Sequence, residues 1–444
     1  MQITLEELLD AREERAGIQA QMLKEHRAPL VCFTMNIAGP EKTSPMIERA
    51  ARHLVRLIES EIEPYEVLGR REDYPKSGPV SLFSVSADAR VLKERMTVIE
   101  EEHPIGRLLD IDVIDVDGHK LSRKTERGCM VCGAPGRVCA AGRLHPVSEL
   151  ASLTNGMLAR YLAELDAERI AAIAKSALLD EVYTTPKPGL VDRLGTGSHT
   201  DMDLSHFERS AEALEPYFSR CVIIGQRGKD EPRELTFATL RAAGLEAEAA
   251  MYAATGGVNT HKGAIFSMGI LCGAIGRLLH GDGDIPSTDE ILTEAAMLSR
   301  AALERDLERI DGSTAGGRAY LEYGVRGIRG EAMDGFPSLR NIALPVYAEA
   351  TRNGKNKNDA GVVTLLHLIA DVYDTNLYKR GGDEGVRFAR DYARSLLKSV
   401  EPTADAIGLM SAEFKKRSLS PGGCADLLAL TYFLSDLKCG GVSN

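Results

Sequence analysis

Basic residues are in the minority in this 444-residue sequence: 54 lysines and arginines stand against 65 aspartates and glutamates, for a net charge of −11. This balance argues against non-specific binding to nucleic acid or to a membrane surface. The sequence also lacks a long hydrophobic run, since its longest, Ala264–Ile275, falls short of the roughly 20 residues of a membrane-spanning helix. We therefore expect no nucleic-acid partner and no membrane partner.

A secretory signal and low-complexity segments are absent as well. The chain begins without the basic and apolar segments that direct secretion. Eight cysteines without such a signal are typical of a reducing compartment, so we expect a cytoplasmic protein. Hydrophobic residues make up 44% and charged residues 27%, which indicates a globular chain, and its length predicts two or three domains.

Two aspartates spaced by one position stand in the apolar segment Gly106–Asp115. Because side chains alternate along a strand, Asp110 and Asp112 would project from one face, with Ile111 and Val113 facing a core. Two neighbouring carboxylates are ligands of the kind that Mg²⁺ prefers, and nucleotidyl transfer uses this ion. A polar edge strand with a solvated face explains the same pattern without a metal.

A second candidate lies upstream, in Phe33–Pro45, where an apolar strand gives way to a Gly-Pro loop and then to a helix. Lys42, the loop amides and the hydroxyls of Thr43 and Ser44 would meet at the helix N-terminus, which suits a phosphate group. Taken alone, however, the segment is better explained as a capped helix with Ser44 as N-cap and Pro45 in the first turn.

Three of the cysteines are grouped with a histidine. Cys129 and Cys132 have the spacing of a zinc knuckle, and Cys139 and His145 complete the ligand types of a Cys₃His site. The spacing of the last two residues is irregular, which leaves a loop with reduced thiols as the alternative.

The periodicity of the chain changes after residue 146. Before it, helices expected at 3–26, 45–62 and 87–102 alternate with strands expected at 29–35, 79–85 and 107–117. After it, only helical patterns follow, at 161–183, 204–225, 235–254, 260–280, 287–309, 338–351, 358–378, 383–398 and 420–438. We predict a multidomain protein: an N-terminal α/β (α+β) domain at 1–157 and an all-α domain at 158–444.

Glycine-rich interruptions hold the polar residues of the second domain. The first interruption carries Lys187, Asp192, His199, Asp201 and Asp203. We expect substrate contacts from Lys187, Asp192 and His199, with Lys187 on phosphate. We expect the carboxylates at 201 and 203 to hold Mg²⁺. A capping box of Thr200 and Asp203 explains the second of these carboxylates in part.

Two more loops are candidates for anion binding. Thr255–Gly263 runs into an apolar helix and resembles an anion cradle at a helix N-terminus, although it is no Walker motif. The segment 326–331 is expected to be a basic loop. We expect substrate contacts from five residues of these loops: Asn259, His261, Lys262, Arg329 and Glu331.

The helix expected at 358–378 carries His367, Asp371 and Asp374 at positions i, i+4 and i+7, which would form one polar stripe on an apolar helix. A buried polar stripe needs a metal, a ligand or a cationic partner. A salt-bridged seam between helices is the alternative to a functional role.

Segments of the first domain together resemble citrate lyase holo-acyl-carrier-protein synthase. They are Ala11–Arg15 with Gln19, Asn36–Pro45, Gly106–Asp115 and Cys129–His145. The resemblance implies a nucleotidyltransferase fold and the transfer of phosphoribosyl-dephospho-CoA to a serine of the lyase's apo acyl-carrier (gamma) subunit, with release of pyrophosphate. It implies catalysis by Asp110 and Asp112 with Mg²⁺, and substrate contacts from Arg12, Asn36 and Lys42.

Segments of the second domain resemble triphosphoribosyl-dephospho-CoA synthase. They are 186–192, 199–203, 257–263, 330–337, 371–377 and 420–426. The resemblance implies that ATP is condensed with 3′-dephospho-CoA and that adenine is expelled, and this product is the precursor that the first domain uses. We expect Asp371 or Asp374 to act as the base, because a packed helix holds a side chain more firmly than a loop does.

Two other readings remain open at this point. The related maturation of malonate decarboxylase uses the same precursor, although the loop at 39–42 and the cysteine cluster favour citrate lyase. Alternatively, the first domain is a zinc-stabilised module that only docks a carrier protein, and the second is a nucleotide glycohydrolase. Release of pyrophosphate with purified carrier protein separates the last reading from the others.

Overall fold

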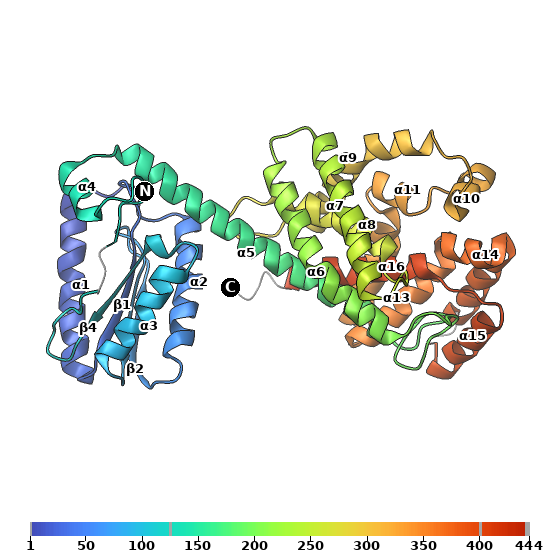
Figure 1. Ribbon diagram of the computed structural model, residues 1–444. Helices are drawn as coiled ribbons and strands as arrows, with labels where there is room; N and C mark the ends of the chain where they lie inside the picture. Colours follow the sequence, from blue (N-terminus) through green and yellow to red (C-terminus); the bar gives the residue numbers. More distant parts are fainter. Residues whose placement is uncertain (1, 124–126, 399–401, 440–444) are drawn as a thin grey trace. The chain divides into compact units, whose positions relative to one another are not determined.

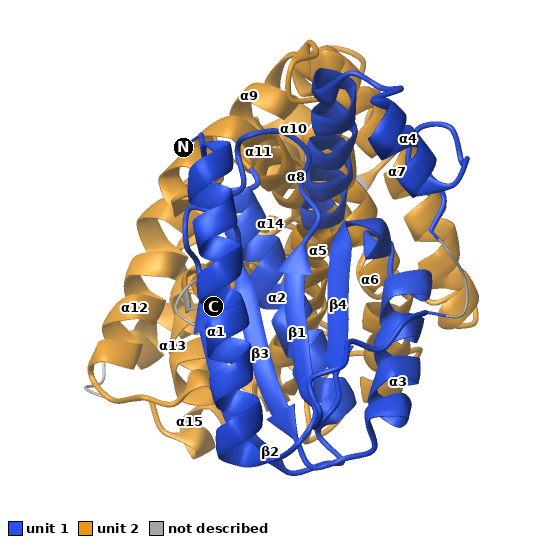
Figure 2. Cartoon of the chain, turned by 90° about the vertical axis from the view of Figure 1, so that its left-hand side faces the viewer, with its two compact units in different colours: residues 1–163, 281–283 blue, residues 164–280, 284–444 orange. Residues whose placement is uncertain are grey.

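A computed structural model describes residues 2–123, 127–398 and 402–439 (Figure 1). The chain forms two compact units, residues 1–163 with 281–283 and residues 164–280 with 284–444 (Figure 2). The long helix α5 (Val147–Tyr183) belongs to both, because the division between residues 163 and 164 falls within it. The boundary expected near residue 158 lies in the same helix.

Unit 1 is built on a four-stranded antiparallel sheet with the order β2-β3-β1-β4. The strands are β1 (Leu30–Met35), β2 (Val67–Asp73), β3 (Val80–Val85) and β4 (Leu109–Ile114). The helices before the shared α5 are α1 (Leu5–His26), α2 (Pro45–Ile62), α3 (Ala89–Glu102) and the short α4 (Gly136–Gly142), with a 3₁₀ turn η1 (Gly106–Leu108) before β4. In Figures 1 and 2, α1 covers one face of the sheet, and α2 and α3 lie on the other.

The strand register decides which face of the sheet each side chain occupies. Cys32 of β1 lies opposite Asp112 of β4, and Thr34 lies opposite Asp110, so these four side chains share the face that α1 covers. Ile111 and Val113 are fully buried on the other face. The predicted alternation along β4 is therefore confirmed.

Most expected elements of unit 1 are present. Ser44 is the N-cap of α2 and accepts a 3.2 Å hydrogen bond from the Ile47 amide, with Pro45 in the first turn, so the capped-helix interpretation of this segment is confirmed. β2 was not predicted from the sequence. It is an exposed edge strand of sequence VLGRRED with an irregularity at Gly69, so it has no apolar alternation to detect.

The described residues of unit 2 form helices joined by loops. After α5, its helices are α6 (Leu204–Arg227), α7 (Arg233–Ala254), α8 (Lys262–Leu278), α9 (Thr288–Leu307), α10 (Ala315–Tyr323), α11 (Gly327–Met333), η2 (Leu339–Ala343), α12 (Leu344–Arg352), α13 (Lys357–Asp371), α14 (Thr375–Leu397), α15 (Ala404–Lys416) and α16 (Gly422–Cys439). The apolar helix α8 is buried continuously from Met268 to Arg277 and forms the centre of the core. Within residues 2–123, 127–398 and 402–439, none of the helices combines the length and the apolar character needed to cross a membrane.

Two expectations for this unit are wrong. Residues 327–333 form helix α11 instead of a basic loop. The helix expected at 358–378 ends at Asp371, because Val372 is extended with φ −90° and ψ 141°. Asp374 caps the next helix, α14, by accepting hydrogen bonds from the amides of Asn376 and Leu377. His367, Asp371 and Asp374 therefore do not form one helical stripe.

Candidate active sites

Unit 1 contains a cavity of about 480 Å³ that is lined by α1, by residues from all four strands and by the loop after β1. Four residues that the sequence singled out line it together: Arg12, Asn36, Lys42 and Asp110. They come from α1, from the loop at 36–42 and from β4, which are far apart in the sequence.

The lining of this cavity carries an excess of positive charge. Its cations are Arg12, Arg15, Lys42, Arg71 and Arg127, and its carboxylates are Glu14, Asp73 and Asp110. Lys42 is half-buried and donates a hydrogen bond to the Ile37 carbonyl. Burial, and then the charge of Arg12, lower the pKa of Lys42. A partly enclosed cationic cavity favours a phosphate-bearing ligand.

The two aspartates of β4 differ in their surroundings. Asp110 lines the cavity and lies 3.5 Å from the hydroxyl of Thr34. Asp112 does not line it, and its carboxylate lies 2.5 Å from the ammonium of Lys120. Of the two, Asp110 is therefore the better candidate for a contact with a ligand in the cavity, and Mg²⁺ binding by the pair stays a prediction.

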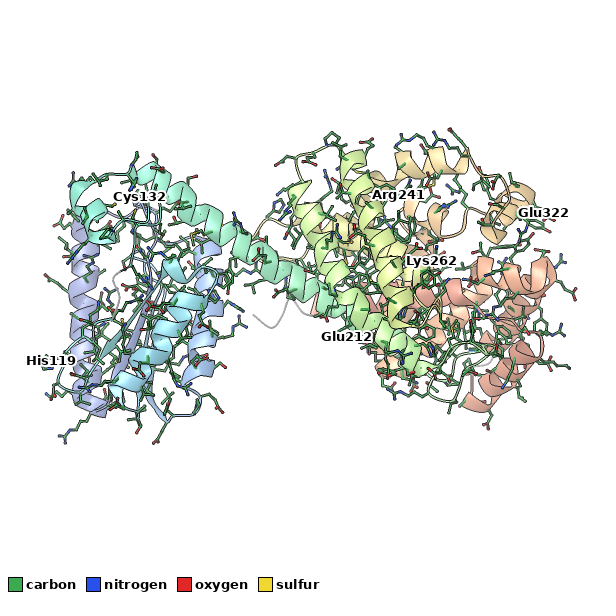
Figure 3. All side chains as sticks on the ribbon, in the orientation of Figure 1. His119, Cys132, Glu212, Arg241, Lys262 and Glu322 are labelled. Carbon is green, nitrogen blue, oxygen red and sulfur yellow. The ribbon has the colours of Figure 1, made fainter. Side chains whose placement is uncertain are left out.

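The cysteine cluster of the sequence is also a cluster in space. The ligand atoms of Cys129, Cys132, Cys139 and His145 all lie within 4.8 Å of one another. Cys132 is exposed in the loop that precedes α4 (Figure 3). Three sulfur atoms and one imidazole nitrogen at this spacing match the donor set of a structural zinc site.

Unit 2 contains a larger cavity, of about 720 Å³, where the polar loops meet. Nine of the expected site residues line it: Lys187, His199, Asp201, Asn259, His261, Lys262, Glu331, Asp371 and Asp374. Lys262 stands at the start of α8 (Figure 3), where its ammonium pairs with Glu248 at 2.7 Å. The side-chain oxygen of Asn259 lies 3.4 Å from the Lys262 amide at the same helix end.

Asp192 and Arg329 do not line this cavity. The carboxylate of Asp192 accepts hydrogen bonds from the amides of Lys187 (2.9 Å) and Leu194 (2.8 Å), so it fastens the loop around Lys187. Arg329 is exposed on α11, where the sequence predicted a loop. A contact between either side chain and a ligand in the cavity is therefore not supported.

The expected Mg²⁺ pair of Asp201 and Asp203 is not supported either. Asp203 lies outside the cavity lining and is itself the N-cap of α6, with His206 as its reciprocal partner instead of Thr200. The side chain of Asp201 is 64% exposed. Among the described residues, neither aspartate belongs to a group of three metal-ligand atoms within 4.8 Å.

Lys187 is a buried ion-pair partner. Its ammonium lies 2.5 Å from the Glu181 carboxylate and 2.7 Å from the Glu181 carbonyl oxygen, and both side chains are less than 10% exposed. Burial raises the pKa of Glu181, and Lys187 opposes the shift. Lys187 thus has a counterion inside the protein and also lines the cavity, and its expected contact with phosphate stays a prediction.

We expect Glu181→Gln to lower the free energy of unfolding of unit 2 by about 3–5 kcal/mol, because it leaves the Lys187 charge buried without a counterion. Glu246→Gln is the matched control, since it breaks an ion pair with Arg220 whose side chains are 50% and 65% exposed. The control should cost about 1 kcal/mol or less. Urea unfolding followed by circular dichroism compares the two variants, and equal costs would contradict the assignment.

His261 has an unused polar atom at the cavity wall. Its Nδ1 lies 2.7 Å from the Ser210 hydroxyl, whereas its Nε2 and the hydroxyl of Thr260 are buried without a partner among the described residues. Burial, and then the charge of Lys187, lower the pKa of His261 to about 3. His261 is therefore a neutral hydrogen-bonding group instead of the cation that an anion cradle would use.

Two aspartates near the start of α16 line this cavity, and one of them, Asp426, was not predicted from the sequence. Asp374 is buried, and its second oxygen accepts a 2.8 Å hydrogen bond from the Cys424 amide, so it ties α14 to α16. Asp426 of α16 is only partly buried and lines the cavity. Burial, and then the charges of Glu181 and Asp374, raise the pKa of Asp426.

Asp426 packs closely against the start of α8. A Cβ added to Gly263 would lie 1.9 Å from the Asp426 carboxylate, so a larger residue here would push that carboxylate out of its position. The segment 420–426 belongs to the resemblance described above, but a single carboxylate in the first turns of a helix carries no periodic signal. Only the approach of α8 gives Asp426 its position.

Charged side chains also stand at the rim of this cavity. His199 bridges the Ser420 hydroxyl (2.9 Å) and the guanidinium of Arg380 (3.1 Å). Burial, and then the charge of Arg380, lower the pKa of His199. The Glu331 carboxylate accepts hydrogen bonds from the Ser338 hydroxyl (2.6 Å) and the Ser338 amide (3.1 Å). Asp371 is about half exposed and pairs with Arg394 at 3.2 Å.

Two units of unlike fold, each with a nucleotide-sized cavity lined by charged groups, define a two-domain enzyme for phosphorylated substrates. Residues 3–161 match the family model for apo-citrate lyase phosphoribosyl-dephospho-CoA transferase, and residues 167–444 match that for ATP:dephospho-CoA triphosphoribosyl transferase. The chain belongs to the CitXG family, in which these two transferase domains are fused.

Curated relatives support this placement over almost the whole chain. The protein named CitXG of Haemophilus influenzae is 34% identical over 98% of this chain and 97% of its own length. The CitXG protein of Leuconostoc mesenteroides subsp. cremoris is 31% identical over the same shares. The 2-(5''-triphosphoribosyl)-3'-dephosphocoenzyme-A synthase of Klebsiella pneumoniae is 39% identical over 65% of this chain and 98% of its own length. Both family resemblances seen in the sequence are confirmed.

Proposed function

We propose that each cavity is the active site of the family domain in which it lies, so that the chain carries out two group transfers in succession. In unit 2, ATP and 3′-dephospho-CoA form 2′-(5″-triphosphoribosyl)-3′-dephospho-CoA and adenine. In unit 1, the phosphoribosyl-dephospho-CoA group passes to a serine of the apo acyl-carrier subunit of citrate lyase, and pyrophosphate leaves. The observation that carries this proposal is the presence of one charged cavity in each of the two matched domains.

The cationic cavity of unit 1 suits the second transfer. The carrier serine attacks the phosphorus nearest the ribose, its oxygen forms the new bond, and the bond to the pyrophosphate oxygen breaks. Arg12, Lys42 and Arg127 line the cavity and would bind the phosphates and the departing pyrophosphate. Asp110, the carboxylate of β4 that lines the cavity, would hold Mg²⁺, which would stabilise negative charge on the leaving group. This chemistry makes unit 1 a nucleotidyltransferase.

The acid-rich cavity of unit 2 suits the first transfer. The 2′-hydroxyl of dephospho-CoA attacks C1′ of the ATP ribose, and the bond from C1′ to adenine breaks. Asp426 would accept the hydroxyl proton, because it lines the cavity and is only partly buried, whereas both oxygens of buried Asp374 accept backbone hydrogen bonds. His261 Nε2 supplies a neutral hydrogen-bonding group for the substrate. The glycosyl transfer has an oxocarbenium-like transition state.

The charge of this second cavity bears on how ATP enters it. Its cations are Lys187, Lys262, Arg326, Lys379 and Arg380, and its carboxylates are Glu181, Asp201, Glu331, Asp334, Asp371, Asp374 and Asp426. A triphosphate that enters a cavity with more carboxylates than cations is repelled unless a divalent ion accompanies it. We therefore propose that ATP binds as its Mg²⁺ complex, and that adenine release stops when Mg²⁺ is chelated.

Two assays on the purified chain test the assignment. With ATP, dephospho-CoA and Mg²⁺ alone, adenine should appear without pyrophosphate, and added apo carrier protein should then release pyrophosphate. Adenine formation from ATP without dephospho-CoA would instead indicate a nucleotide glycohydrolase. Equal transfer to the malonate decarboxylase carrier would contradict the citrate lyase assignment, which the family match of residues 3–161 favours.

Gly263→Ala should lower adenine release by roughly a factor of 10² or more, because the new methyl group displaces the proposed base Asp426. The matched control is Gly408→Ala, in helix α15 of the same unit, where an added Cβ meets nothing within 4 Å. The control should release adenine at the wild-type rate, and carrier modification from pre-made precursor should be unchanged in both variants. A wild-type rate in Gly263→Ala would exclude Asp426 as the base.

A further inference from the structure

We propose that Cys129, Cys132, Cys139 and His145 bind a structural zinc ion whose role is to hold Arg127 in the cavity of unit 1. The metal site stands on its own geometry, and its link to catalysis rests on the function proposed for that cavity. Four protein ligands leave no open position on zinc, so the ion would organise the protein instead of acting on substrate.

The distances within the cluster fit a tetrahedral ion. Cys132 Sγ lies 3.4 Å from Cys139 Sγ and 3.3 Å from His145 Nε2, and all four ligand atoms lie within 4.8 Å of one another. Zinc bonds of about 2.3 Å to sulfur and about 2.0 Å to nitrogen place tetrahedral ligands roughly 3.5–3.8 Å apart. Small adjustments of these side chains would complete the site.

The backbone around the first two cysteines has the turn that such a site needs. The Gly133 amide donates a 3.0 Å hydrogen bond to the Cys129 carbonyl, and the Cys129 amide donates to the Ala134 carbonyl. Gly133 has φ +75°, which favours glycine. The Val131 amide lies 3.4 Å from the Cys129 sulfur, an amide-to-sulfur contact that stabilises a thiolate.

The other two ligands come from α4 and from the residues that follow it. Cys139 is buried within α4, and its carbonyl accepts a 3.1 Å hydrogen bond from the Leu144 amide. On the far side of the His145 ring, Nδ1 lies 3.8 Å from a carboxylate oxygen of Glu149. A carboxylate beside the outer nitrogen orients a zinc-binding histidine and raises its basicity. A disulfide between two cysteines would leave the other two ligands unexplained.

Arg127 is tied to this cluster by the backbone. Its carbonyl accepts a 3.0 Å hydrogen bond from the Gly136 amide, and the adjacent Gly128 forms a bridge to Pro135. The segment 127–129 is thus one side of the loop that carries the first two cysteines. Zinc binding would hold this loop in one conformation and so fix the position of the Arg127 backbone.

The side chain of Arg127 reaches from that loop into the active-site cavity. Its guanidinium donates to the Leu109 carbonyl at 2.6 Å and lies 2.8 Å from the carboxylate of Glu100, whose side chain is fully buried. Leu109 immediately precedes Asp110, and both Arg127 and Asp110 line the cavity. The zinc loop therefore sets the position of a cation beside the carboxylate proposed to hold Mg²⁺.

Metal content tests the site directly. Full-length protein purified without chelator should carry about one zinc per chain, as a single four-ligand site requires. Cys132→Ser should lose the metal, and because Cys132 is exposed, this change removes a ligand and little packing. The control Cys32→Ala removes a thiol of the same unit outside the cluster and should keep the metal. Cobalt exchanged into the wild type should show the absorption of a tetrahedral thiolate complex.

The proposal would be overturned if the wild type contained no zinc and two of its cysteines reacted with a thiol reagent only after reduction. That result would indicate a disulfide. Zinc retained by Cys132→Ser would overturn the proposal as well. The cobalt spectrum of the wild type needs no variant, so a failure of Cys132→Ser to fold does not remove the test.

Kinetics test the role of Arg127 as a phosphate-binding residue that the zinc loop holds in place. Chelation of zinc and Arg127→Gln should each raise the KM for the triphosphoribosyl precursor by roughly 10-fold or more, the loss expected for one charged hydrogen bond to phosphate. Arg127→Gln should keep its zinc, and adenine release should be normal in both cases. An unchanged KM after zinc removal would overturn the link between the zinc site and Arg127. If the wild type bound zinc but modified no carrier, only the proposed function would be refuted.

Discussion

Asp110→Asn should reduce modification of the acyl-carrier subunit by a factor of roughly 10² to 10³ while adenine release from ATP continues at the wild-type rate. Asp110 is the β4 carboxylate that lines the cationic cavity, and its replacement by a neutral amide would weaken the Mg²⁺ binding proposed for it. Mass spectrometry of the carrier, supplied with pre-made precursor, measures the transfer.

Asp112→Asn is the matched control for this prediction. Asp112 shares the same face of β4 but lies outside the cavity lining and is paired with Lys120 at 2.5 Å. Its loss should change transfer by less than roughly fivefold, as for a partly exposed ion pair. If the two variants lost transfer equally, the metal would be held by both carboxylates, and the structural distinction between them would be refuted.

Asp426→Asn should lower adenine release by a factor of roughly 10² to 10⁴, the usual contribution of a general base. The change keeps the shape of the side chain against Gly263, so a folding defect is not expected. Carrier modification from pre-made precursor should be unaffected, since that step is assigned to unit 1. Adenine in the supernatant, measured by chromatography under saturating ATP, provides the rate.

The comparison with Asp371→Asn separates Asp426 from the base expected from the sequence. Asp371 is about half exposed and paired with Arg394, so water and an arginine already satisfy its carboxylate. We expect this variant to keep most of its activity. If adenine release fell strongly in Asp371→Asn and stayed normal in Asp426→Asn, the base would be Asp371, at the end of α13.

The first unit was readily predicted because its signals are local. The alternation of aspartates with Ile111 and Val113 fixes which side of β4 faces the core, and the register with β1 then brings Asp110 beneath α1. The difference between Asp110 and Asp112 could not be predicted in this way. It depends on Lys120, which approaches Asp112 from beyond the end of the strand.

The second unit was predicted less well because its site depends on how helices meet. Asp374 fits a helical spacing from Asp371, but an aspartate followed by free amides also starts a new helix, and here capping prevails. Asp426 becomes part of the site only through the close approach of Gly263. Neither a helix packing contact nor a buried pair such as Lys187 and Glu181 has a periodic signature in the sequence.

If two independent active sites in one chain act in succession, variants that are inactive at different sites should complement each other, and this is the most direct test. Apo carrier protein is incubated with ATP, 3′-dephospho-CoA, Mg²⁺ and either Asp110→Asn, Asp426→Asn or a mixture of the two, and its mass is measured. Each variant alone should leave the carrier unmodified, and the mixture should add the mass of one phosphoribosyl-dephospho-CoA group. A carrier left unmodified by the mixture, with wild-type protein active in parallel, would contradict the account.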